Sequence, residues 1–526
     1  MKFNILKKIW LVLLISALSW TSVQAEQTDW QRRKVDWLAG PGGRIKAIRH
    51  PKTKELPVES TSGFNFFSLE SAGLQTLDNN IDSPPVAGFV PQIAIAITDE
   101  RSDDLDWVAQ IHMSVVGDYL TDNPEEDYVI GLFDTGASFI LLGNDGADRS
   151  GIFDADLLTT NIMEFGGATS SSYATVSQPL GVFIDGLAAV DPNTMMLDDS
   201  NMVGESNVAI SVGSAAAPGE PGELTAVGSL MSVYFVTAIF NDNPVSITYQ
   251  GSNYTSPDIR FYDLYDNSAP DYENSIPLNL IPTGASDVQY FPDLEAIFDF
   301  VYQPGSPSII GSFLQSLFFI NSVDLCNGVR RAIDKDRFML DTGAQVSVVG
   351  TNVGSRLGLS RANPDFEVEI QDATGEITIE PGFYIDTIEI VALGDWLRFT
   401  NVPVIMLDIS SPEGGYLDGI IGMNLFTEFN LVLRGGGLSG QDPPSLEFER
   451  IPAQLVGDIS PQGGDGIVNF LDLAALAEAW LANPVSSNWN PQADLAPRYT
   501  PDSVIDFLDF AELMEYWLGS TTQQVH

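Results

Sequence analysis

Cysteine and histidine are nearly absent from this chain. Its 526 residues include a single Cys, Cys326, and three His, which are His50, His112 and His526. One Cys excludes an intramolecular disulfide framework, and so few His argue against a His-ligated catalytic zinc. A Ser-His-Asp triad would have to use His50 or His112, but neither lies in a recognisable partner motif. His112 lies in an alternating stretch, where we expect it to serve packing.

Positive charge is also scarce. The chain has 24 Lys and Arg against 71 Asp and Glu, which gives a formal net charge of -47. Such a chain is repelled by phosphate backbones and anionic lipids, so the charge argues against nucleic acid and anionic membrane as partners. Eight basic residues nevertheless lie together between Arg32 and Lys54. We call this stretch the basic segment.

Long apolar runs are missing after the first 25 residues. Near the N-terminus, Lys2, Lys7 and Lys8 precede an apolar run at 9–18, and Val23-Gln24-Ala25 forms a small-residue cleavage site. This order is typical of a signal peptide, and the run is too short to span a bilayer. We therefore expect bacterial-type export, a secreted or cell-surface protein, and no membrane span.

Short β-like runs, separated by Gly, Pro and Asp, dominate the chain from Val86 onward. Few stretches show a long helical period, so the pattern predicts an all-β architecture. The chain length suggests three or four units with ample hydrophobic core.

One motif occurs twice, 207 positions apart. The first copy is Asp134-Thr135-Gly136-Ala137 and the second is Asp341-Thr342-Gly343-Ala344, each between two apolar runs. A lone Asp-Thr-Gly would indicate no more than a turn with an Asx hydrogen bond. Two copies in the same setting predict a pair of carboxylates that act together.

Paired carboxylates can hydrolyse an amide without a metal. Two of them face to face cannot both be ionised at low cost, so they share one proton and the apparent pKa values of the pair separate. The ionised member can take a proton from water while the protonated member donates to a carbonyl oxygen. The Gly of each motif permits a tight turn, and each Thr hydroxyl can bond across to the other loop.

These motifs resemble those of the pepsin-like and retropepsin-like aspartic proteases, in which each of two lobes donates one Asp-Thr-Gly. The resemblance implies an all-β, two-lobed fold with pepsin-like bilobal β-barrel architecture. It also implies an aspartic endopeptidase that hydrolyses polypeptide through Asp134 and Asp341, with no cofactor for catalysis. The supporting residues would be Thr135, Gly136, Thr342 and Gly343. The alternative is a non-catalytic, surface-anchored binding protein on a protease scaffold.

The repeat extends to the strands before each Asp. Residues 109–116 and 128–133 predict a hairpin that delivers Asp134, with an acidic turn between its strands. Residues 316–323 and 337–340 predict the counterpart before Asp341, with a basic turn. A duplicated lobe explains both patterns.

Two stretches of the form Glu-x-x-x-Ala-Thr also fit the repeat, at 164–169 and 369–374. They lie at similar distances after Asp134 and Asp341. Each predicts a hairpin, which is either a flap over the substrate or an ordinary surface hairpin.

By the same resemblance, two apolar residues and a Gly close each lobe by passing the Asp loop. Ile420-Ile421-Gly422 fits this role in the second lobe, 81 residues after Asp341. In the first lobe Ile309-Ile310-Gly311 fits well locally but lies 177 residues after Asp134. Ala226-Val227-Gly228 lies 94 residues after Asp134, so the spacing favours Gly228.

The C-terminal region contains a repeat of its own. Residues 458–472 and 494–509 each carry spaced acidic or amide residues that lead into an apolar-periodic helix. Oxygen ligands at alternating loop positions are typical of an EF-hand-like calcium loop. The plain alternative is a two-helix terminal module with acidic caps.

This pair of loops resembles a dockerin module, a small α-helical domain that binds calcium and docks on cohesin partners. The resemblance implies two calcium sites and a cohesin-like protein partner. The ligands would be Asp458, Asp465, Ile467, Asn469 and Asp472 for one ion, and Asp494, Asp502, Val504, Asp506 and Asp509 for the other. Both loops depart from the pattern by extra residues before Asp465 and Asp502. The dipeptides Phe470-Leu471 and Phe507-Leu508 occupy equivalent places and would suit an apolar docking face.

The expected units follow from these patterns. They are a signal peptide at 1–25, a basic N-terminal segment at 26–85, a first protease lobe at 86–248, an inter-lobe connection at 249–274, a second lobe at 275–452, a dockerin-like module at 453–520 and a tail at 521–526. The two Asp residues on so acidic a protein would form a negatively charged cleft, to which the basic segment should be attracted. This arrangement resembles that of pepsin-like zymogens, which keep a basic pro-segment over the cleft. Residues 26–85 are therefore either an inhibitory pro-segment or a disordered linker.

Overall fold

A computed structural model describes most of the chain after residue 79. The described residues are 31–33, 45–50, 80–101, 110–123, 127–137, 139–166, 171–213, 225–282, 288–289, 316–334, 337–371, 377–393, 396–409, 416–436, 443–451, 459–460, 468–483, 486, 488, 490, 493, 495 and 504–515. The predicted signal peptide lies outside them. Among them, no helix is both long enough and apolar enough to cross a membrane.

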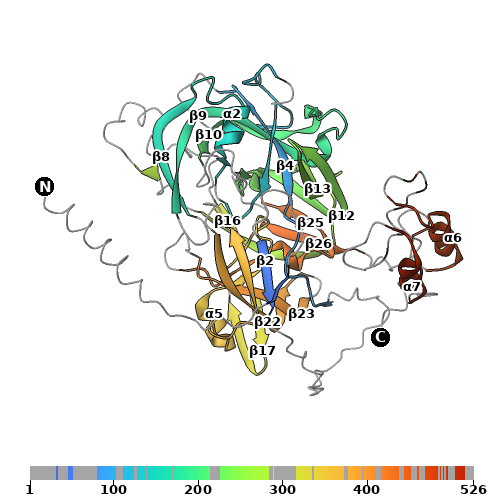
Figure 1. Cartoon of the computed structure of the whole chain (residues 1–526). Coiled ribbons are helices and arrows are strands. Elements are labelled where there is room, and N and C mark those ends of the chain that lie inside the picture. Colours follow the sequence, from blue (N-terminus) through green and yellow to red (C-terminus); the bar gives the residue numbers. More distant parts are fainter. Residues whose placement is uncertain are drawn as a thin grey trace.

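Nine strands form one sheet, which lies at the top of Figure 1. In sheet order these strands are β15 (Val288–Gln289), β8 (Leu158–Gly166), β9 (Ser171–Gly186), β4 (Gln92–Thr98), β6 (Val129–Phe133), β11 (Ala226–Val227), β7 (Leu141–Leu142), β10 (Val203–Val212) and β5 (Gln110–His112). Eight of them come from residues 92–227, so this sheet belongs mainly to the first Asp-Thr-Gly motif.

The other strands form a sheet of 17, whose members β16, β17, β22 and β23 lie below in Figure 1. Its strands are β1 (Gln31–Arg33), β2 (Ile45–His50), β3 (Asn80–Asp82), β12 (Phe235–Tyr249), β13 (Ser252–Asp263), β14 (Asn274–Pro282), β16 (Ser316–Ile320), β17 (Val323–Asn327), β18 (Arg330–Asp334), β19 (Phe338–Leu340), β20 (Val348–Val349), β21 (Phe366–Gln371), β22 (Ile377–Val391), β23 (Trp396–Met406), β24 (Gly419–Ile421), β25 (Phe429–Arg434) and β26 (Ser445–Arg450). This sheet holds the second Asp-Thr-Gly motif.

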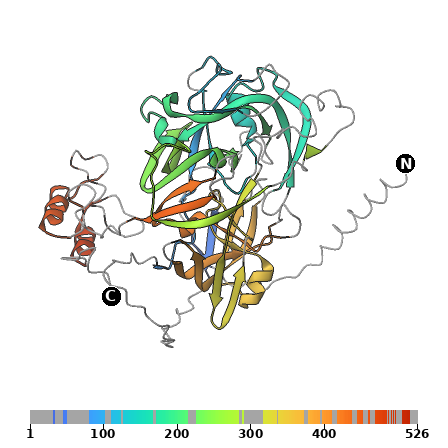
Figure 2. The ribbon, with the colours of Figure 1, turned by 180° about the vertical axis from the view of Figure 1, so that it is seen from behind.

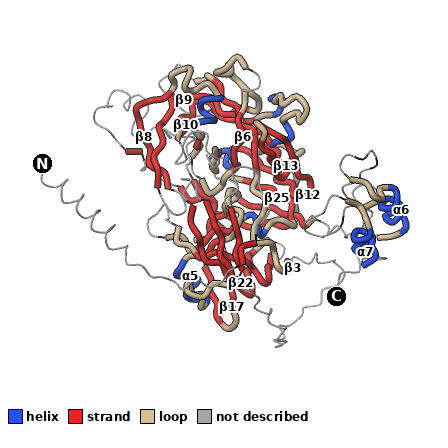
Figure 3. Tube along the Cα trace, in the orientation of Figure 1, coloured by secondary structure: helices blue, strands red, loops and turns tan. Residues whose placement is uncertain are grey.

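Helices are short and few in the described residues, as the tube in Figure 3 shows. They are α2 (Asn144–Arg149), α3 (Leu230–Tyr234), α5 (Thr351–Leu357), α6 (Phe470–Glu478) and α7 (Phe507–Glu515), with short 3-10 turns at Leu187–Ala189, Asp199–Asn201 and Met423–Leu425. The protein is therefore mostly β-structure, in agreement with the sequence pattern.

The same strand pairing occurs twice. In the first half of the chain, β11 runs parallel to β6 and β10 runs parallel to β7. In the second half, β24 runs parallel to β19 and β23 runs parallel to β20. Helix α2 and hairpin β8–β9 follow β7, just as α5 and hairpin β21–β22 follow β20. The strand pairing confirms the duplicated pattern.

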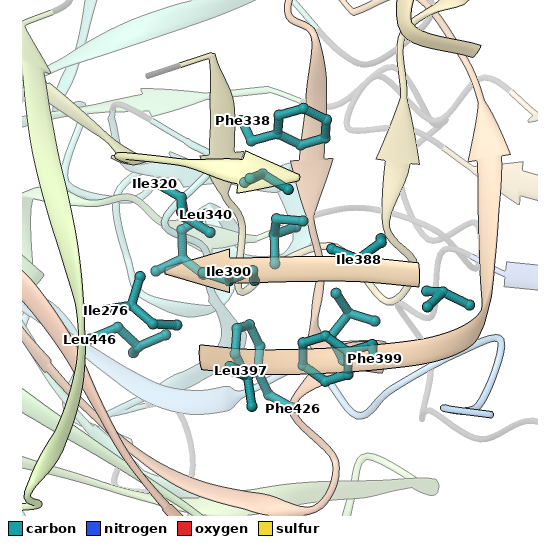
Figure 4. Close-up of a cluster of buried hydrophobic side chains, with 14 of the residues drawn as sticks. Ile276, Ile320, Phe338, Leu340, Ile388, Ile390, Leu397, Phe399, Phe426 and Leu446 are labelled. Carbon is teal, nitrogen blue, oxygen red and sulfur yellow. The ribbon is translucent and has the colours of Figure 1, made fainter. Parts of the chain in front are cut away.

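Each half packs its own hydrophobic core around the strand that leads to its Asp. In the first half the last strand residue, Phe133, is fully buried in the core that also contains Ile184 and Val227. In the second half Leu340 is 1% exposed in a core with Phe399 and Phe426, part of which is drawn in Figure 4. Both carboxylates therefore follow a strand that packing holds in place.

The hairpin predicted before Asp134 is wrong. Strand β6 pairs antiparallel with β4, whereas β5, from the predicted partner, pairs with β10. Burial explains the choice, because every residue of β4 is buried while two of the three β5 residues are exposed. A strand covered on both faces buries more apolar surface than an edge strand does.

The hairpin predicted before Asp341 is confirmed in its pairing but not in its connection. Strand β16 pairs antiparallel with β19. The chain between them is not a turn, because it forms a second hairpin from β17 and β18. Strand β17 also pairs with β22, which ties this inserted hairpin to the larger sheet.

The stretch predicted to connect the lobes, 249–274, contains regular structure. Strand β13 pairs antiparallel with β12 from Phe235 to Tyr249. Strand β12 also pairs with β25 of the second half. This part of the chain is thus a hairpin that joins the first half to the larger sheet, and the expected limits of the units stay predictions.

Parts of the N-terminal segment are built into the larger sheet. Strand β2, from the basic segment, pairs antiparallel with β21, and β3 pairs with β23. Ile81 of β3 is only 1% exposed and belongs to the core of the second half. The last residues of the 26–85 segment are therefore part of the fold.

The two C-terminal helices lie beside each other and away from both sheets, as Figures 1 and 2 show from opposite sides. They share a small core that contains Leu476 of α6 and Leu513 of α7. The Leu481 N–H donates to the Ile505 carbonyl at 2.8 Å, and the Ile505 N–H donates to the Ala482 carbonyl at 3.1 Å. These bonds join the end of the first repeat to the start of the second helix.

Candidate active site

Each Asp of the repeated motif lies at the end of a strand, next to a parallel neighbour. The Asp134 N–H donates to the Val227 carbonyl of β11 at 2.9 Å. The Asp341 N–H donates to the Ile421 carbonyl of β24 at 3.1 Å. The backbone of both Asp residues is thus fixed by the same kind of bond.

The chain that follows β11 and β24 passes directly behind the Asp loops. A Cβ atom on Gly228 would lie 2.6 Å from the Ala137 carbonyl oxygen, and one on Gly422 would lie 2.5 Å from that of Val346. Only Gly fits such a close approach of two backbones. The structure therefore confirms Gly228 as the counterpart of Gly422, and the rival Gly311 lies outside the described residues.

The two Asp loops are locked together by their threonines. The Thr135 hydroxyl donates to the Leu340 carbonyl at 2.8 Å and accepts the Thr342 N–H at 3.0 Å. In return, the Thr342 hydroxyl donates to the Phe133 carbonyl at 2.7 Å and accepts the Thr135 N–H at 3.0 Å. The two Thr side chains are 0% and 2% exposed, so all four bonds are shielded from water.

This interlock brings each Asp against the glycine of the opposite loop. A Cβ on Gly136 would lie 2.4 Å from the carboxyl carbon of Asp341. A Cβ on Gly343 would lie 2.4 Å from the carboxyl carbon of Asp134. The two Asp side chains are 4% exposed each, which makes the arrangement symmetric in burial as well as in contacts.

The arrangement is suited to proton exchange between two carboxyl groups and a small molecule between them. Carboxylates held close in a shielded site share a proton, so one can act as a base and the other as an acid. The Gly136 N–H donates to the Asp134 carboxylate at 2.9 Å, which fixes the orientation of that side chain. The sequence-predicted Asp, Thr and Gly residues are all brought together here.

The hairpins predicted after each Asp are present in part. Strand β8 pairs with β9 through Gly166, and β21 pairs with β22 through Gln371. The tips at 167–170 and 372–376 lie outside the described residues. The choice between a flap and a surface hairpin therefore stays open.

His112 is hydrogen-bonded to a buried serine of the smaller sheet. His112 Nε2 lies 2.8 Å from the Ser206 hydroxyl, and burial lowers the pKa of this imidazole. Ser206 is only 2% exposed, so its hydroxyl is closed to a polypeptide substrate. The pair joins β5 to β10, in agreement with the packing role expected for His112.

Half of the predicted calcium ligands can be placed. Asp472 is fully buried, and its two oxygens accept N–H bonds from Ile459, Ser460 and Asn469 at 2.7 to 2.8 Å. Asp509, also fully buried, accepts N–H bonds from Leu495 and Asp506 at 2.6 Å. These oxygens suit calcium in kind, and in the structure they cap helices.

The remaining predicted ligands lie outside the described residues. They are Asp458, Asp465, Ile467, Asp494 and Asp502. Among the described residues no three carboxylate, His or Cys side chains gather as a metal site would require. The calcium sites stay a prediction.

A buried polar group that the repeated motifs do not indicate lies beside the second Asp loop. Ser347 and Asn424 are 1% and 0% exposed, and the Ser347 hydroxyl donates to the Asn424 side-chain oxygen at 2.8 Å. One signal was present in the sequence, because Asn424 interrupts the apolar run from Ile420 to Phe426. A polar residue in such a run is expected to have a specific partner.

Comparison with known proteins relates part of the chain to one family. The family model described as aspartyl protease matches residues 326–425, which include the Asp341 loop, hairpin β21–β22 and β24. This part of the chain is therefore similar to aspartyl proteases. No curated protein matches the chain.

Solved structures also match, at low similarity. The aspartic proteinase from Irpex lacteus is 12% identical, with 70% of this chain and 98% of that chain covered and a TM-score of 0.29. Conglutin gamma, a basic 7S globulin from lupine seeds, is 10% identical, with coverage of 69% and 96% and a TM-score of 0.32. Basic 7S globulin from soybean is 10% identical, with coverage of 68% and 96% and a TM-score of 0.31.

Proposed function

We propose that this chain is a secreted, two-lobed aspartic endopeptidase whose Asp134 and Asp341 form the catalytic dyad. The observation that carries the proposal is the interlock of the two Asp-Thr-Gly loops. Four reciprocal Thr bonds and two glycines place each carboxyl group beside the opposite loop. The aspartyl protease match at 326–425 supports the same function.

The proposed reaction needs only the two carboxyl groups and water. The ionised Asp takes a proton from the water, whose oxygen attacks the peptide carbonyl carbon, while the protonated Asp donates to the carbonyl oxygen. The tetrahedral diol then collapses: the ionised carboxylate takes a proton from one diol hydroxyl as the C=O bond re-forms, the C–N bond breaks, and the other carboxyl group gives its proton to the leaving nitrogen. One product is a carboxylic acid, the other is an amine, and the dyad again holds one proton.

Isosteric replacement of each Asp tests the proposal. Asp134→Asn and Asp341→Asn should each lower the hydrolysis of fluorescein-labelled casein by roughly 1,000-fold or more, because a single carboxyl group lacks its partner. Asp271→Asn, which replaces an exposed Asp, is the matched control and should keep wild-type activity. The assays run from about pH 3 to pH 7, so that both acidic and neutral conditions are covered.

The outcomes separate the two candidate functions. If wild-type protein binds casein but never cleaves it across this pH range, the chain is a non-catalytic binding protein on a protease scaffold. If either Asn variant keeps substantial activity, the dyad assignment is wrong even though the protein is a protease.

We further propose that the C-terminal module binds calcium and docks on a cohesin-like partner. Phe470 and Phe507 are each 74% exposed, and the adjacent Leu471 and Leu508 are each 55% exposed. Two equal apolar pairs on an otherwise acidic module suit a protein interface. The test is limited proteolysis of the full chain, because calcium that binds the folded module should protect residues 453–526 from cleavage. Equal cleavage with calcium and with a chelator would contradict calcium binding.

We also propose that the basic segment is part of an inhibitory pro-segment. Strand β2 of this segment pairs with β21, and Arg49 and Glu367 are opposite each other in the register. Acidification protonates carboxylates, which weakens the attraction of a basic segment to an acidic protein. Wild-type protein held at pH 3 should release the segment, whereas Asp134→Asn should keep it. Equal rates of release would rule out self-cleavage.

A further inference from the structure

A segment without regular secondary structure passes beside both Asp loops. We call residues 83–91 the crossing segment, because it leads from β3 in the larger sheet to β4 in the smaller one. The Gly88 N–H donates to the Gln345 carbonyl at 2.8 Å, beside the Asp341 loop. Near its other end, the Pro91 carbonyl accepts the Phe133 N–H at 3.0 Å, one residue before Asp134.

The crossing segment is packed against the backbone that closes the second Asp loop. A Cβ on Gly88 would lie 2.4 Å from the Met423 carbonyl carbon and 2.6 Å from the Asn424 nitrogen. Ala87 is 8% exposed and shares a hydrophobic cluster with Ala344 and Val346. The segment therefore forms one wall of the Asp341 loop.

A chain of buried hydrogen bonds joins this wall to the loop. The Asn424 side-chain N–H donates to the Pro85 carbonyl at 3.3 Å, and the Asn424 side-chain oxygen accepts the Ser347 hydroxyl at 2.8 Å. The Ser347 oxygen in turn accepts the Gly422 N–H at 3.1 Å. The chain of bonds thus runs from the crossing segment to the glycine that passes behind Asp341.

The first half of the molecule has different residues at these positions. Ile140 lies six residues after Asp134, as Ser347 lies six residues after Asp341, and Ile140 is buried in the hydrophobic core. Leu230 lies two residues after Gly228, where the second half has Asn424 after Gly422. The polar connection therefore belongs to the Asp341 loop and is not a general property of the repeat.

We propose that Asn424 is a positioning residue that couples the crossing segment to the Asp341 loop. It acts through Ser347 and Gly422, because the chain at Gly422 and Met423 packs behind this loop and the Met423 N–H donates to the Ala344 carbonyl at 2.9 Å. A catalytic carboxyl group must be held to within a fraction of an ångström, and buried hydrogen bonds provide such rigidity. The role in catalysis rests on the proposed dyad, whereas the coupling itself does not.

Truncation of the Asn side chain tests the coupling. Asn424→Ala should lower kcat for fluorescein-labelled casein about tenfold or more while KM changes by less than about threefold, since binding surfaces away from the loop are intact. Ser347→Ala should behave in the same way, and Ser347→Thr, which keeps the hydroxyl, should retain most of the activity. Hydrogen exchange followed by mass spectrometry should be faster in peptides that cover 338–349 and 417–426.

Asn241 offers a matched control. Its side-chain N–H groups donate to the carbonyls of Phe426 and Phe429 at 3.1 and 2.7 Å, so it also joins two halves of the chain but does not touch an Asp loop. Asn241→Ala should lower the melting temperature to a similar degree and leave kcat and the exchange of 338–349 unchanged.

The results decide two separate questions, which are whether Asn424 positions the Asp341 loop and whether the chain is a protease. If Asn424→Ala exchanges like wild type over 338–349, or has the same kcat as Asn241→Ala well below its melting temperature, the positioning role is overturned. Ser347→Thr that is as slow as Ser347→Ala would remove the hydroxyl from the argument and overturn the coupling path. A wild-type protein without proteolytic activity would overturn the proposed function, while the exchange experiment would still decide the coupling.

Discussion

The two halves of the molecule build the same loop on different supports. Both deliver an Asp from a buried strand, bond its N–H to a parallel neighbour and close the loop with a Gly. The first loop has the apolar Ile140 behind it, whereas the second has the buried Ser347 and Asn424. Backbone pairing, Gly and Thr therefore define the paired carboxyl groups, while the layer beneath them can differ.

The halves also differ in how they hold buried carboxyl groups. In the first half Glu205 on β10 is 1% exposed, and neither of its oxygens has a hydrogen-bond partner among the described residues. In the second half Glu380 is 7% exposed and bonds to Arg361 at 2.6 Å. An unpaired buried acid makes the first half sensitive to pH, because burial opposes ionisation.

Among the changes that compare the two halves, replacement of the two glycines should have the largest effect, and it tests the symmetry of the site. Gly136→Ala and Gly343→Ala each place a methyl group 2.4 Å from the carboxyl carbon of the opposite Asp. Each should lower kcat/KM on the order of 100-fold or more, because the carboxyl groups must move apart. The control is Ala137→Ser, which leaves the contact between each Gly and the opposite Asp unchanged. Gly251→Ala is less suitable as a control, because the positive φ of Gly251 would strain an Ala at that position. A large difference in kcat/KM between the two Gly variants would show that the two loops do not contribute equally.

The pH dependence of stability should distinguish the halves. Burial raises the pKa of Glu205 to about 8 from an ordinary value of 4.5. Between these values the folded chain holds a proton that the unfolded chain has lost, so the contribution of Glu205 to stability is complete below pH 4.5 and is lost as the pH rises towards 8. At about 1.4 kcal/mol for each unit of pKa shift, the loss reaches several kcal/mol.

Thermal unfolding from pH 4 to pH 8 measures this slope. Glu205→Gln, which cannot ionise, should flatten most of the decline above pH 6. A smaller decline below that value should persist, because burial also raises the pKa of Asp185 to about 6. Glu380→Gln, the control in the second half, should leave the slope in place. An unchanged slope in Glu205→Gln would show that Glu205 is not the source of the pH dependence.

Removal of one Thr hydroxyl should have an intermediate effect on both halves at once. Thr135→Val leaves the Leu340 carbonyl and the Thr342 N–H without their partners, and Thr342→Val does the same to Phe133 and Thr135. Each variant should lose about 2 to 5 kcal/mol of unfolding free energy, as expected for two unsatisfied buried groups. Thr→Ser at either position should recover most of the loss in chemical denaturation. Unequal losses would show that one loop depends more on the interlock than the other.

The residue at which a shortened chain begins should have the smallest effect on stability. A chain that begins at residue 80 keeps β3, whereas one that begins at residue 86 loses Ile81 from the core and Pro85 from its bond with Asn424. The shorter chain should be less stable by about 2 to 3 kcal/mol, because a buried Ile is lost. Equal melting curves would show that β3 is dispensable and that processing at about residue 85 is compatible with the fold.

The repeat and the residues of its two loops are readable in the sequence alone. Asp134 and Asp341, with their Thr and Gly neighbours, were readable because the same short motif occurs twice between apolar runs. The spacing favoured Gly228 over Gly311, and the structure agrees because a backbone loop must be closed within its own half of the chain. The mostly β character followed from short alternating runs.

The pairing of strands depends on the tertiary structure. The sequence pattern predicted residues 109–116 as the partner of β6, whereas in the structure the fully buried strand β4 pairs with it. The crossing segment, the Thr interlock and the bond of Asn424 to Pro85 likewise join residues that lie up to 339 positions apart. Contacts over such distances depend on how whole sheets pack and not on local propensity, so a local sequence pattern cannot specify them.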